Sequence, residues 1–484
     1  MTRYEPVIGL EVHAQIHTAS KMFCRCPVVE DTGDLEPNTY VCPVCTAMPG
    51  TLPVINRRAV ELTIMTGLAL NCEILPVSRF ARKSYFYPDL PKGYQISQHA
   101  LPLAKDGYLD IETENGTRRV RIDNVHLEED TGKLFHVGNV SLVDFNRAGV
   151  PLIEIVTKPD MRSAEEVRAF AVKLREILIY LGVNSGDMEK GVMRFEASVS
   201  VRPVGSDELM PRHEIKNLNS FRALARAVAY EIEQQIKVLE SGGRVTQETM
   251  GWDDARGVTY TQRTKEYAHD YRYFPEPDLP PLEVGREWVE SLRGQLPELP
   301  DVRRARFRAE YGLGDFETEL LVADRAVADY FEAAVALGKV SPKTLANWIT
   351  GDLFRLMKET KRGIDEIPVS PEGLVDLIQR VEEGTVNLNT GREILEEMVA
   401  TGKEARQIIE EKGLAQISDE AALRGIIEQV LDQHPAQVEQ YLGGKTQVAG
   451  WLMGQVMKAT KGRANPQLVR SLLTEALEAR REAR

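Results

Sequence analysis

The chain has 484 residues, of which 43% are hydrophobic and 27% charged, and its formal net charge is −13. A chain of this size outgrows a single core, so we expect two or three domains. The acidic balance excludes a surface that coats nucleic acid non-specifically, because phosphate neutralisation needs clustered Lys and Arg. No run approaches the roughly eighteen apolar residues of a membrane span, and Glu5 precedes the first apolar run. We therefore expect a cytoplasmic protein without a signal peptide.

Residues 6–16 (PVIGLEVHAQI) alternate as a half-buried strand does. The alternation places Glu11, His13 and Gln15 on one face and the apolar residues on the other. A carboxylate and an imidazole therefore share the polar face of this strand.

Four of the five cysteines form two close pairs directly after this strand. Thiolates at CxC and CxxC spacing can converge tetrahedrally on zinc, which predicts a structural zinc site, with reduced free thiols as the alternative. A four-thiolate site leaves no open position for chemistry. The predicted zinc ligands are Cys24, Cys26, Cys42 and Cys45, whereas Cys72 is expected to be a small buried apolar residue.

Residues 82–98 (RKSYFYPDLPKGYQISQ) combine basic and aromatic side chains around two prolines. We interpret them as a loop that either binds a phosphate-bearing ligand through residues such as Lys83 and stacks a base, or packs on the core. Residues 119–133 predict a strand that ends in the acidic run Glu128, Glu129 and Asp130.

Residues 141–156 predict two short strands around a glycine turn, with Arg147 at the bend. A helix follows: Ser163 and Glu166 form a capping box, and an apolar stripe ends at Gly182. Residues 193–202 and 212–218 then alternate strictly, which predicts an antiparallel pair of strands. Their polar faces carry Glu196 in the first run, and Glu214 with Lys216 in the second.

Three strands thus present a carboxylate beside a cationic or imidazole side chain. For a single strand, the usual explanation is a solvated face, but three together favour a ligand-binding sheet. The carboxylates suit Mg²⁺, which prefers oxygen ligands and substrate phosphates, and nearby Arg and Lys would neutralise those phosphates. The candidate magnesium ligands are Glu11, His13, Glu129, Glu196 and Glu214.

The prolines within residues 269–282 exclude long regular elements and indicate the edge of the first domain. From about residue 296 the pattern is helical, with a last set of helices near 419–432, 435–441, 445–460 and 465–482. The predicted fold class is α+β: a domain on an antiparallel sheet with flanking helices (1–295), an all-α domain (296–410) and a small α-helical tail (411–484). From Lys445 onward basic residues exceed acidic ones by five, which either marks a solvated helix or an RNA-binding face.

Seven segments resemble the B subunit of the bacterial and organellar glutamyl/aspartyl-tRNA amidotransferase. They are VIGLEVHAQ, KSYFYPDLPKGYQISQ, HLEEDTGK, SLVDFNRAGVPLIEIV, EIKNLNSF, DYRYFPEPDL and GQVMKATKGRANPQLV, and they span residues 7–469. The resemblance implies that ATP, with Mg²⁺, phosphorylates the side-chain carboxylate of Glu or Asp misacylated onto tRNA(Gln) or tRNA(Asn). Ammonia then displaces the phosphate.

The resemblance places the family's metal positions on Glu11, His13, Glu129, Glu196 and Glu214. Charge and position add Arg147 and Lys216 as phosphate contacts. Strict alternation would group Glu129 with Val125 and Leu127 rather than with His126. We keep Glu129 for its place in HLEED, with Glu128 as second choice.

The chain shows no glutaminase motif of its own, so the resemblance implies a heterotrimer with a glutamine-hydrolysing, amidase-type A subunit and a small C subunit. It also implies that the tail grips tRNA, through Lys445, Lys458, Lys461 and Arg463. A zinc-stabilised tRNA-binding module without catalysis is the alternative function.

Overall fold

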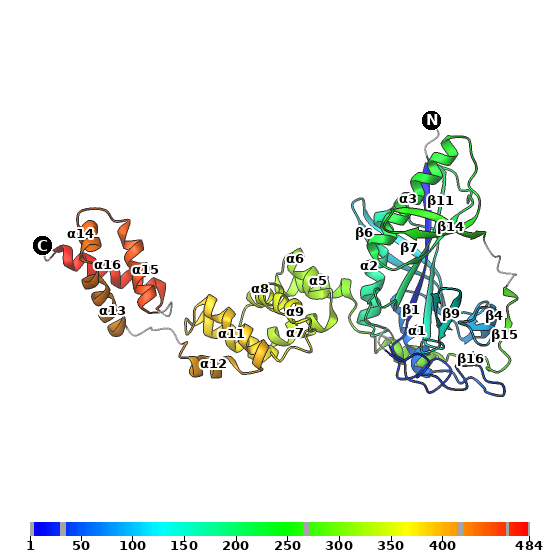
Figure 1. Ribbon diagram of the computed structural model, residues 1–484, viewed down its shortest axis with the longest axis horizontal. Coiled ribbons are helices and arrows are strands. Elements are labelled where there is room, and N and C mark those ends of the chain that lie inside the picture. Colours follow the sequence, from blue (N-terminus) through cyan, green and yellow to red (C-terminus); the bar gives the residue numbers. More distant parts are fainter. Residues whose placement is uncertain (1–3, 30–34, 265–270, 415–419, 461–463, 483–484) are drawn as a thin grey trace. The chain divides into compact units, whose positions relative to one another are not determined.

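A computed structural model describes residues 4–29, 35–264, 271–414, 420–460 and 464–482 (Figure 1). The chain divides into two compact units, Met1–Pro300 and Asp301–Arg484. In the described residues, strands belong to the first unit and the second is helical, which confirms the α+β prediction.

A nine-stranded sheet forms the centre of the first unit, in the order β14-β13-β12-β11-β1-β10-β7-β6-β2. The β12/β13 pair is parallel, and the other neighbours are antiparallel. The strands are β1 (Tyr4–Gln15), β2 (Glu73–Ile74), β6 (Ala104–Thr113), β7 (Gly116–Glu129), β10 (Pro151–Thr157), β11 (Met193–Pro203), β12 (His213–Leu218), β13 (Glu248–Asp253) and β14 (Val258–Thr264).

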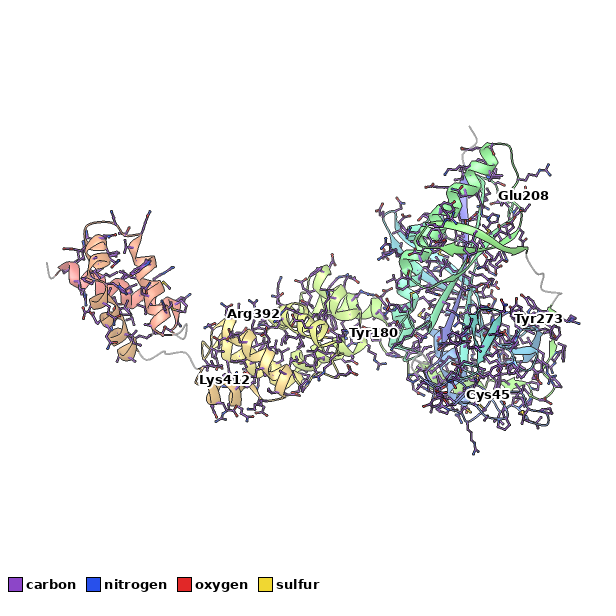
Figure 2. The ribbon with its side chains drawn as sticks, in the orientation of Figure 1. Cys45, Tyr180, Glu208, Tyr273, Arg392 and Lys412 are labelled. Atoms are coloured by element: carbon purple, nitrogen blue, oxygen red, sulfur yellow. The ribbon has the colours of Figure 1, made fainter. Side chains whose placement is uncertain are left out.

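Helices cover the apolar face of this sheet: α1 (Arg57–Ala69), α2 (Ala164–Tyr180) and α3 (Phe221–Glu240) pack on its strands, and α4 (Arg286–Arg293) packs on α1. The Ser163 hydroxyl caps α2 by accepting from Glu166 N at 3.2 Å. In the predicted capping box the Glu166 carboxylate would accept from Ser163 N. In the structure it accepts instead from the preceding residue, Arg162 N, at 2.7 Å. Tyr180, at the other end of α2, is buried (Figure 2).

The segment predicted as a loop, 82–98, is mostly a β-hairpin. Strands β4 (Phe80–Ser84) and β5 (Tyr94–Gln98) pair with each other, and β15 (Phe274–Pro275) adds a third strand to them. The two prolines lie in the connection between the strands, so they mark the turn, while the residues on either side pair with each other. Because β5 packs against β7, the hairpin lies over part of the large sheet.

The two strands predicted within 141–156 exist but belong to different sheets. Strand β9 (Val140–Asp144) pairs with β8 (Lys133–Val137), whereas β10 joins the large sheet beside β1. The proline-rich segment contributes only two-residue strands, β15 and β16 (Leu282–Glu283), the latter paired with β3 (Val77–Ser78).

The second unit consists of helices in its described part. They are α5 (Pro300–Tyr311), α6 (Asp315–Val322), α7 (Arg325–Ala336), α8 (Pro342–Asn347), the π-helix η2 (Trp348–Leu353), α9 (Phe354–Thr360), α10 (Pro371–Glu382), α11 (Leu388–Thr401), α12 (Ala405–Lys412), α13 (Glu420–Gln433), α14 (Pro435–Leu442), α15 (Val448–Ala459) and α16 (Pro466–Glu482). The last four share an apolar core that includes Ile427 and Leu472, and their bounds match the four helices predicted for the tail within a few residues. Within the described ranges, every helix is too short or too polar to cross a membrane.

Candidate functional site

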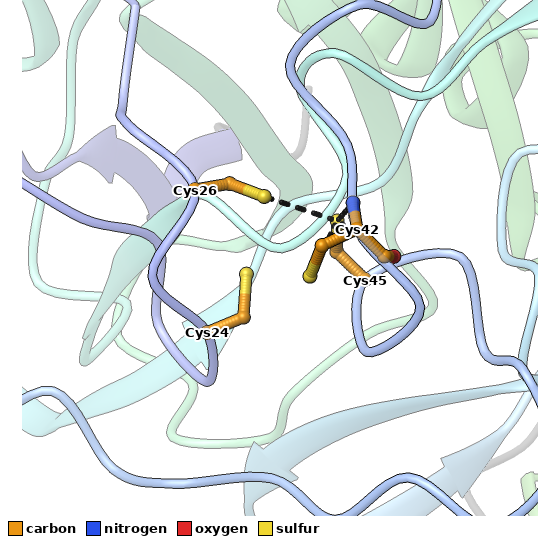
Figure 3. A group of neighbouring side chains, drawn as sticks. All are labelled: Cys24, Cys26, Cys42 and Cys45. Carbon is orange, nitrogen blue, oxygen red and sulfur yellow. Dashed lines mark hydrogen bonds between the residues drawn. The ribbon is translucent and has the colours of Figure 1, made fainter.

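The four paired cysteines meet at one point beside the first strand (Figure 3). Their sulfur atoms all lie within 4.8 Å of one another, with 4.0 Å between Cys26 and Cys45 and 3.9 Å between Cys42 and Cys45. Zinc–sulfur bonds of about 2.3 Å in a tetrahedron place sulfurs about 3.8 Å apart. The knuckle of Cys24, Cys26, Cys42 and Cys45 can therefore hold a metal ion without rearrangement.

Buried Lys21 provides positive charge to this knuckle. Its ammonium lies 3.7 Å from Cys45 Sγ and donates to Tyr40 O at 2.8 Å. A hydrogen bond from Cys24, followed by the charge of Lys21, lowers the pKa of Cys45 to about 4 although burial opposes ionisation. The knuckle thus carries a thiolate, the form of cysteine that binds metals.

The polar face of the large sheet brings three predicted carboxylates together. Glu11 of β1 lies opposite Glu196 of β11, and Glu214 lies on the next strand, β12. Oxygen atoms of Glu11, Glu196 and Glu214 lie within 4.8 Å of one another. Burial, followed by the charges of Glu154, Glu196 and Glu214, raises the pKa of Glu11 to about 7, so this acidic triad carries more negative charge than its surroundings neutralise.

Lys216 provides part of the neutralisation. Its ammonium pairs with Glu196 and lies 2.7 Å from Glu214 Oε1. The structure therefore places Lys216 among the carboxylates of the acidic triad, where a bound cation would compete with it.

The register of the adjacent strands brings a second cluster of polar side chains together. His126, Glu154, His13 and Arg194 are aligned across the adjacent strands β7, β10, β1 and β11. Glu154 Oε2 lies 3.2 Å from His13 Nε2 and 3.3 Å from His126 Nε2. Burial opposes the charged imidazole of His13, but the hydrogen bond with Glu154 and nearby carboxylates raise its pKa to about 9.

Glu128 completes this second cluster in place of Glu129. The Glu128 carboxylate lies 3.8 Å from His13 Nε2 and accepts from Ser97 Oγ at 3.0 Å. Glu154 was not among the predicted residues. The strand PLIEIVT is apolar on both faces, so the sequence signal for Glu154 was a lone carboxylate within an apolar run.

The prediction that Glu129 lies beside Glu11 and His13 is wrong in position. Glu129 accepts from Lys92 Nζ at 2.7 Å and from Ile96 N at 2.9 Å, and it lines a separate cavity of about 260 Å³ next to the cysteine knuckle. Successive residues of a strand face opposite sides, so Glu128 and Glu129 cannot both join His13.

Residues of both clusters line one cavity of about 470 Å³ on the polar face, although Glu214 of the acidic triad is not among them. Its carboxylates include Glu11, Glu128, Glu154 and Glu196, and its cations include Lys83, Arg147, Arg194 and Lys216. Lys83 reaches it from β4, and its ammonium lies 4.9 Å from the centre of the Tyr271 ring. Burial lowers the pKa of Lys83, but the neighbouring Tyr273 (Figure 2), Glu128 and Glu154 outweigh burial and leave that pKa above its ordinary value.

Arg147 lies at the bend where it was predicted and lines the same cavity. It donates to Thr131 O at 2.9 Å and Gly132 O at 2.8 Å, and it lies 3.6 Å from Asp130 Oδ2. The cavity thus places carboxylates, which can hold a metal ion, beside cations, which can neutralise phosphates.

The predicted tRNA-binding residues belong to the second unit. Lys445 and Lys458 are exposed, the latter on α15. Lys461 and Arg463 lie outside the described residues, so their predicted role has no structural description.

Residues 6–290 match the family described as the GatB/GatE catalytic domain, and residues 329–477 match the GatB domain. The chain is 54% identical over 478 residues to the B subunit of the aspartyl/glutamyl-tRNA(Asn/Gln) amidotransferase of Moorella thermoacetica, covering 98% of this chain and all of the relative. It is 52% identical over 477 residues to the B subunit of the same enzyme from Thermodesulfovibrio yellowstonii, again covering 98% of this chain and all of the relative. For that of Thermomicrobium roseum the identity is 54% over 479 residues, covering 98% and 99%. With family matches over most of its length and relatives of this similarity, the chain belongs to the GatB family of tRNA-dependent amidotransferase subunits.

Proposed function

We propose that the chain is the ATP-using B subunit of a glutamine-hydrolysing amidotransferase that acts on misacylated Glu-tRNA(Gln), Asp-tRNA(Asn) or both. The carboxylate oxygen of the substrate attacks the γ-phosphorus of ATP, and the bond to the bridging oxygen breaks, giving an acyl phosphate and ADP. Ammonia then attacks the acyl carbon and loses a proton as phosphate leaves, giving the amide. The observation that carries the proposal is the cavity in which carboxylates from both clusters lie with four cations.

The acidic triad fits Mg²⁺ because it offers three carboxylates from adjacent strands, and the raised pKa of Glu11, caused by burial and by neighbouring carboxylates, supports the choice of a cation as its ligand. The cluster of His13, Glu128 and Glu154 is the second candidate, where binding must displace the proton of His13. When bound, Mg²⁺ neutralises charge that develops on the transferring phosphoryl group. Glu129, whose carboxylate is bound to Lys92, drops out of the proposed ligand set.

We assign Lys83 and Arg147 to the phosphates of ATP. Both side chains line the cavity. The Lys216 ammonium, in contrast, pairs with two carboxylates of the acidic triad, Glu196 and Glu214. Because Lys216 lies between Glu196 and Glu214, its proposed role is to balance charge beside the phosphates.

Zinc is the proposed occupant of the cysteine knuckle. Four sulfurs at tetrahedral spacing match its preference, and a closed site of this kind stabilises the fold without chemistry. Thiolate zinc sites of this kind fit a reducing compartment, which supports the cytoplasm as the location.

Ammonia must come from a partner, which we propose to be an amidase-type A subunit, held in the complex by a small C subunit. The cysteines of this chain do not offer a nucleophile. Four of them form the knuckle, and burial raises the pKa of the fifth, Cys72, to about 12, so its thiolate is scarce at neutral pH. The exposed basic residues of the tail, Lys445 and Lys458 among them, are the proposed tRNA contacts.

The test uses the chain reconstituted with its A and C partners, misacylated Glu-tRNA(Gln), Mg-ATP and glutamine, with Gln-tRNA as the product measured. We expect Glu11→Gln and Glu196→Gln to lose product at least a hundredfold while tRNA binding persists. The matched control is Glu5→Gln, on the same strand as Glu11 but paired with Arg202 outside the cavity. Binding of tRNA by the wild type without ATP turnover would instead favour the zinc-stabilised RNA-binding module.

A further inference from the structure

Arg194 is a half-buried cation of the cavity with no role assigned so far. It is the second residue of β11, directly opposite His13 of β1, and its side chain is 20% exposed. It lines the cavity together with Arg147, which comes from the connection between β9 and β10. Two guanidinium groups from separate parts of the chain therefore reach one end of the cavity.

Asp130 joins the two arginines. Arg194 Nη1 and Nη2 each donate to one oxygen of the Asp130 carboxylate at 3.2 Å, and Arg147 Nε lies 3.6 Å from Oδ2. Gln15 Nε2 donates to Oδ2 at 2.8 Å, and Thr131 N donates to Oδ1 at 2.9 Å. The carboxylate is 4% exposed, so it contacts these donors rather than solvent.

These contacts fix the orientation of both guanidinium groups. Arg194 also donates to Gly191 O, and Arg147 donates to two carbonyl oxygens after Asp130. Of the hydrogen bonds among the described residues, none uses Arg147 Nη1 or Arg194 Nε, so each group keeps donor capacity. Pre-oriented donors of this kind lose little entropy when they bind an anion.

Charge supports the same conclusion. One carboxylate, Asp130, contacts both guanidinium groups, and Glu128 and Glu196 act on Arg194 from the neighbouring clusters, so cationic and anionic groups lie side by side here. The acidic triad and the His13 cluster occupy the neighbouring strand positions. A chain of phosphates fits such a polarity, because a metal can bind it at the acidic end and guanidinium groups at the other.

We propose that Arg147 and Arg194 form a single site for phosphoryl oxygens, with Asp130 as its positioning residue. This proposal rests on the proposed function, because it concerns the phosphoryl group which that reaction transfers. Guanidinium groups that approach from two directions suit the tetrahedral phosphoryl group better than a planar carboxylate. Lysine would not fully replace Arg194, because its ammonium lacks the planar fork that contacts both oxygens of Asp130 through Nη1 and Nη2 while Nε stays available to a ligand.

The experiment measures binding of ATP, ADP and adenosine to the purified full chain with Mg²⁺ by calorimetry, and KM for ATP and kcat in the reconstituted complex. The variants are Arg194→Gln, Arg194→Lys and Asp130→Asn. The matched control is Arg202→Gln, on the same strand and face as Arg194 but paired with Glu5. Zinc content and thermal unfolding show whether each variant is folded.

We expect Arg194→Gln to weaken ATP binding about 10- to 100-fold, as for loss of a hydrogen bond to a charged group, while adenosine binding stays unchanged. Arg194→Lys recovers only part of the affinity. Asp130→Asn raises KM for ATP although it removes no cation, because the two guanidinium groups lose their common charged acceptor. A loss seen for ATP but not ADP assigns the site to the γ-phosphate. If ATP affinity is unchanged but kcat falls, the arginine site binds the phosphoryl group after its transfer to the substrate carboxylate.

Two results would overturn the proposal: Arg194→Gln equal to the wild type in both affinity and kcat, or an equal loss of adenosine binding, which would indicate a collapsed cavity. Either result leaves the proposed function intact if the wild-type complex still forms Gln-tRNA. Conversely, a wild-type complex that binds ATP but forms no Gln-tRNA refutes the function while the binding series still tests the arginine site.

Discussion

Glu128 and Glu129 are consecutive residues of β7, yet the Glu128 carboxylate lies 3.8 Å from His13 Nε2 while that of Glu129 accepts from Lys92 at 2.7 Å. The two carboxylates line different cavities. Removing the charge of Glu128 should therefore have a different consequence from removing the charge of Glu129.

Glu128→Gln is expected to raise the Mg²⁺ concentration for half-maximal amidation by about tenfold or more, in the range found for altered metal-site partners. Glu129→Gln should leave that concentration unchanged, because its carboxylate does not face His13. Titration of Mg²⁺ in the Gln-tRNA assay, with each variant checked for folding, measures both. An equal shift in the two variants would contradict the placement of Glu128 in the metal cluster.

Cys26→Ser should remove the bound zinc, since three thiolates and a hydroxyl hold it weakly. Metal analysis by mass spectrometry should find one zinc per wild-type chain and a much smaller fraction in the variant, together with a lower unfolding temperature. Cys72→Ser is the control, because Cys72 lies outside the knuckle. Full zinc occupancy in Cys26→Ser would refute the four-sulfur site.

Lys216→Met should tighten the binding of a divalent ion to the acidic triad. The ammonium pairs with Glu196 and Glu214, and its loss leaves the three carboxylates without their resident cation. We expect Mn²⁺ affinity, measured by electron paramagnetic resonance, to rise about tenfold, equivalent to about 1.4 kcal/mol. Lys105→Met on β6, whose ammonium pairs with exposed carboxylates, should leave the affinity unchanged. Weaker Mn²⁺ binding in Lys216→Met would show that Lys216 assembles the triad rather than competing for it.

Acid should loosen the packing of α5 on α7 through Glu332. Burial raises the pKa of Glu332, but hydrogen bonds from Arg306, Arg303 and Tyr311 outweigh burial and hold the pKa below its ordinary 4.5. In this window the unfolded chain binds more protons than the folded one, so the stabilisation is complete above pH 4.5 and is lost as pH falls through the lower, folded value.

Hydrogen exchange of the α5 and α7 peptides, followed by mass spectrometry between pH 7 and pH 3 after correction for intrinsic rates, measures this loss. Glu332→Gln should exchange faster than the wild type at pH 7 and resemble it at the acidic end. A constant difference between the two proteins at every pH would contradict an electrostatic origin.

Lys458→Glu should weaken tRNA binding and reduce the slope of log K against log salt by more than one, because it removes one cation and adds an anion. Filter binding at several salt concentrations gives both quantities. Lys237→Glu, an exposed lysine on α3 of the first unit, is the control. Equal slopes for Lys458→Glu and the wild type would exclude a contact between this residue and phosphate.

Local sequence patterns determined the elements that carry the site. The alternation of residues 6–16 placed Glu11 and His13 on one strand face, and the spacing of Cys24 to Cys45 indicated the knuckle. The capping signal at Ser163 marked the start of α2. These features were predictable because each depends on a repeat or hydrogen bond within a few residues.

For Glu129 the strand alternation was correct and the motif-based assignment was wrong. Alternation grouped Glu129 with Val125 and Leu127, away from His126, and the structure has this arrangement. Successive side chains of a strand alternate between its two faces. Where one face is buried, this alternation decides which side chains face the cavity.

Only the tertiary structure decided which strands became neighbours. It aligned His126, Glu154, His13 and Arg194 across four strands, inserted Lys216 between two carboxylates, and joined Arg147 to Arg194 through Asp130. Such relationships depend on how separate segments of the chain pair and pack, and the pairs that include His13 join segments more than a hundred residues apart. The sequence alone cannot specify them, because the periodicity of one strand carries no information about the strand that pairs with it.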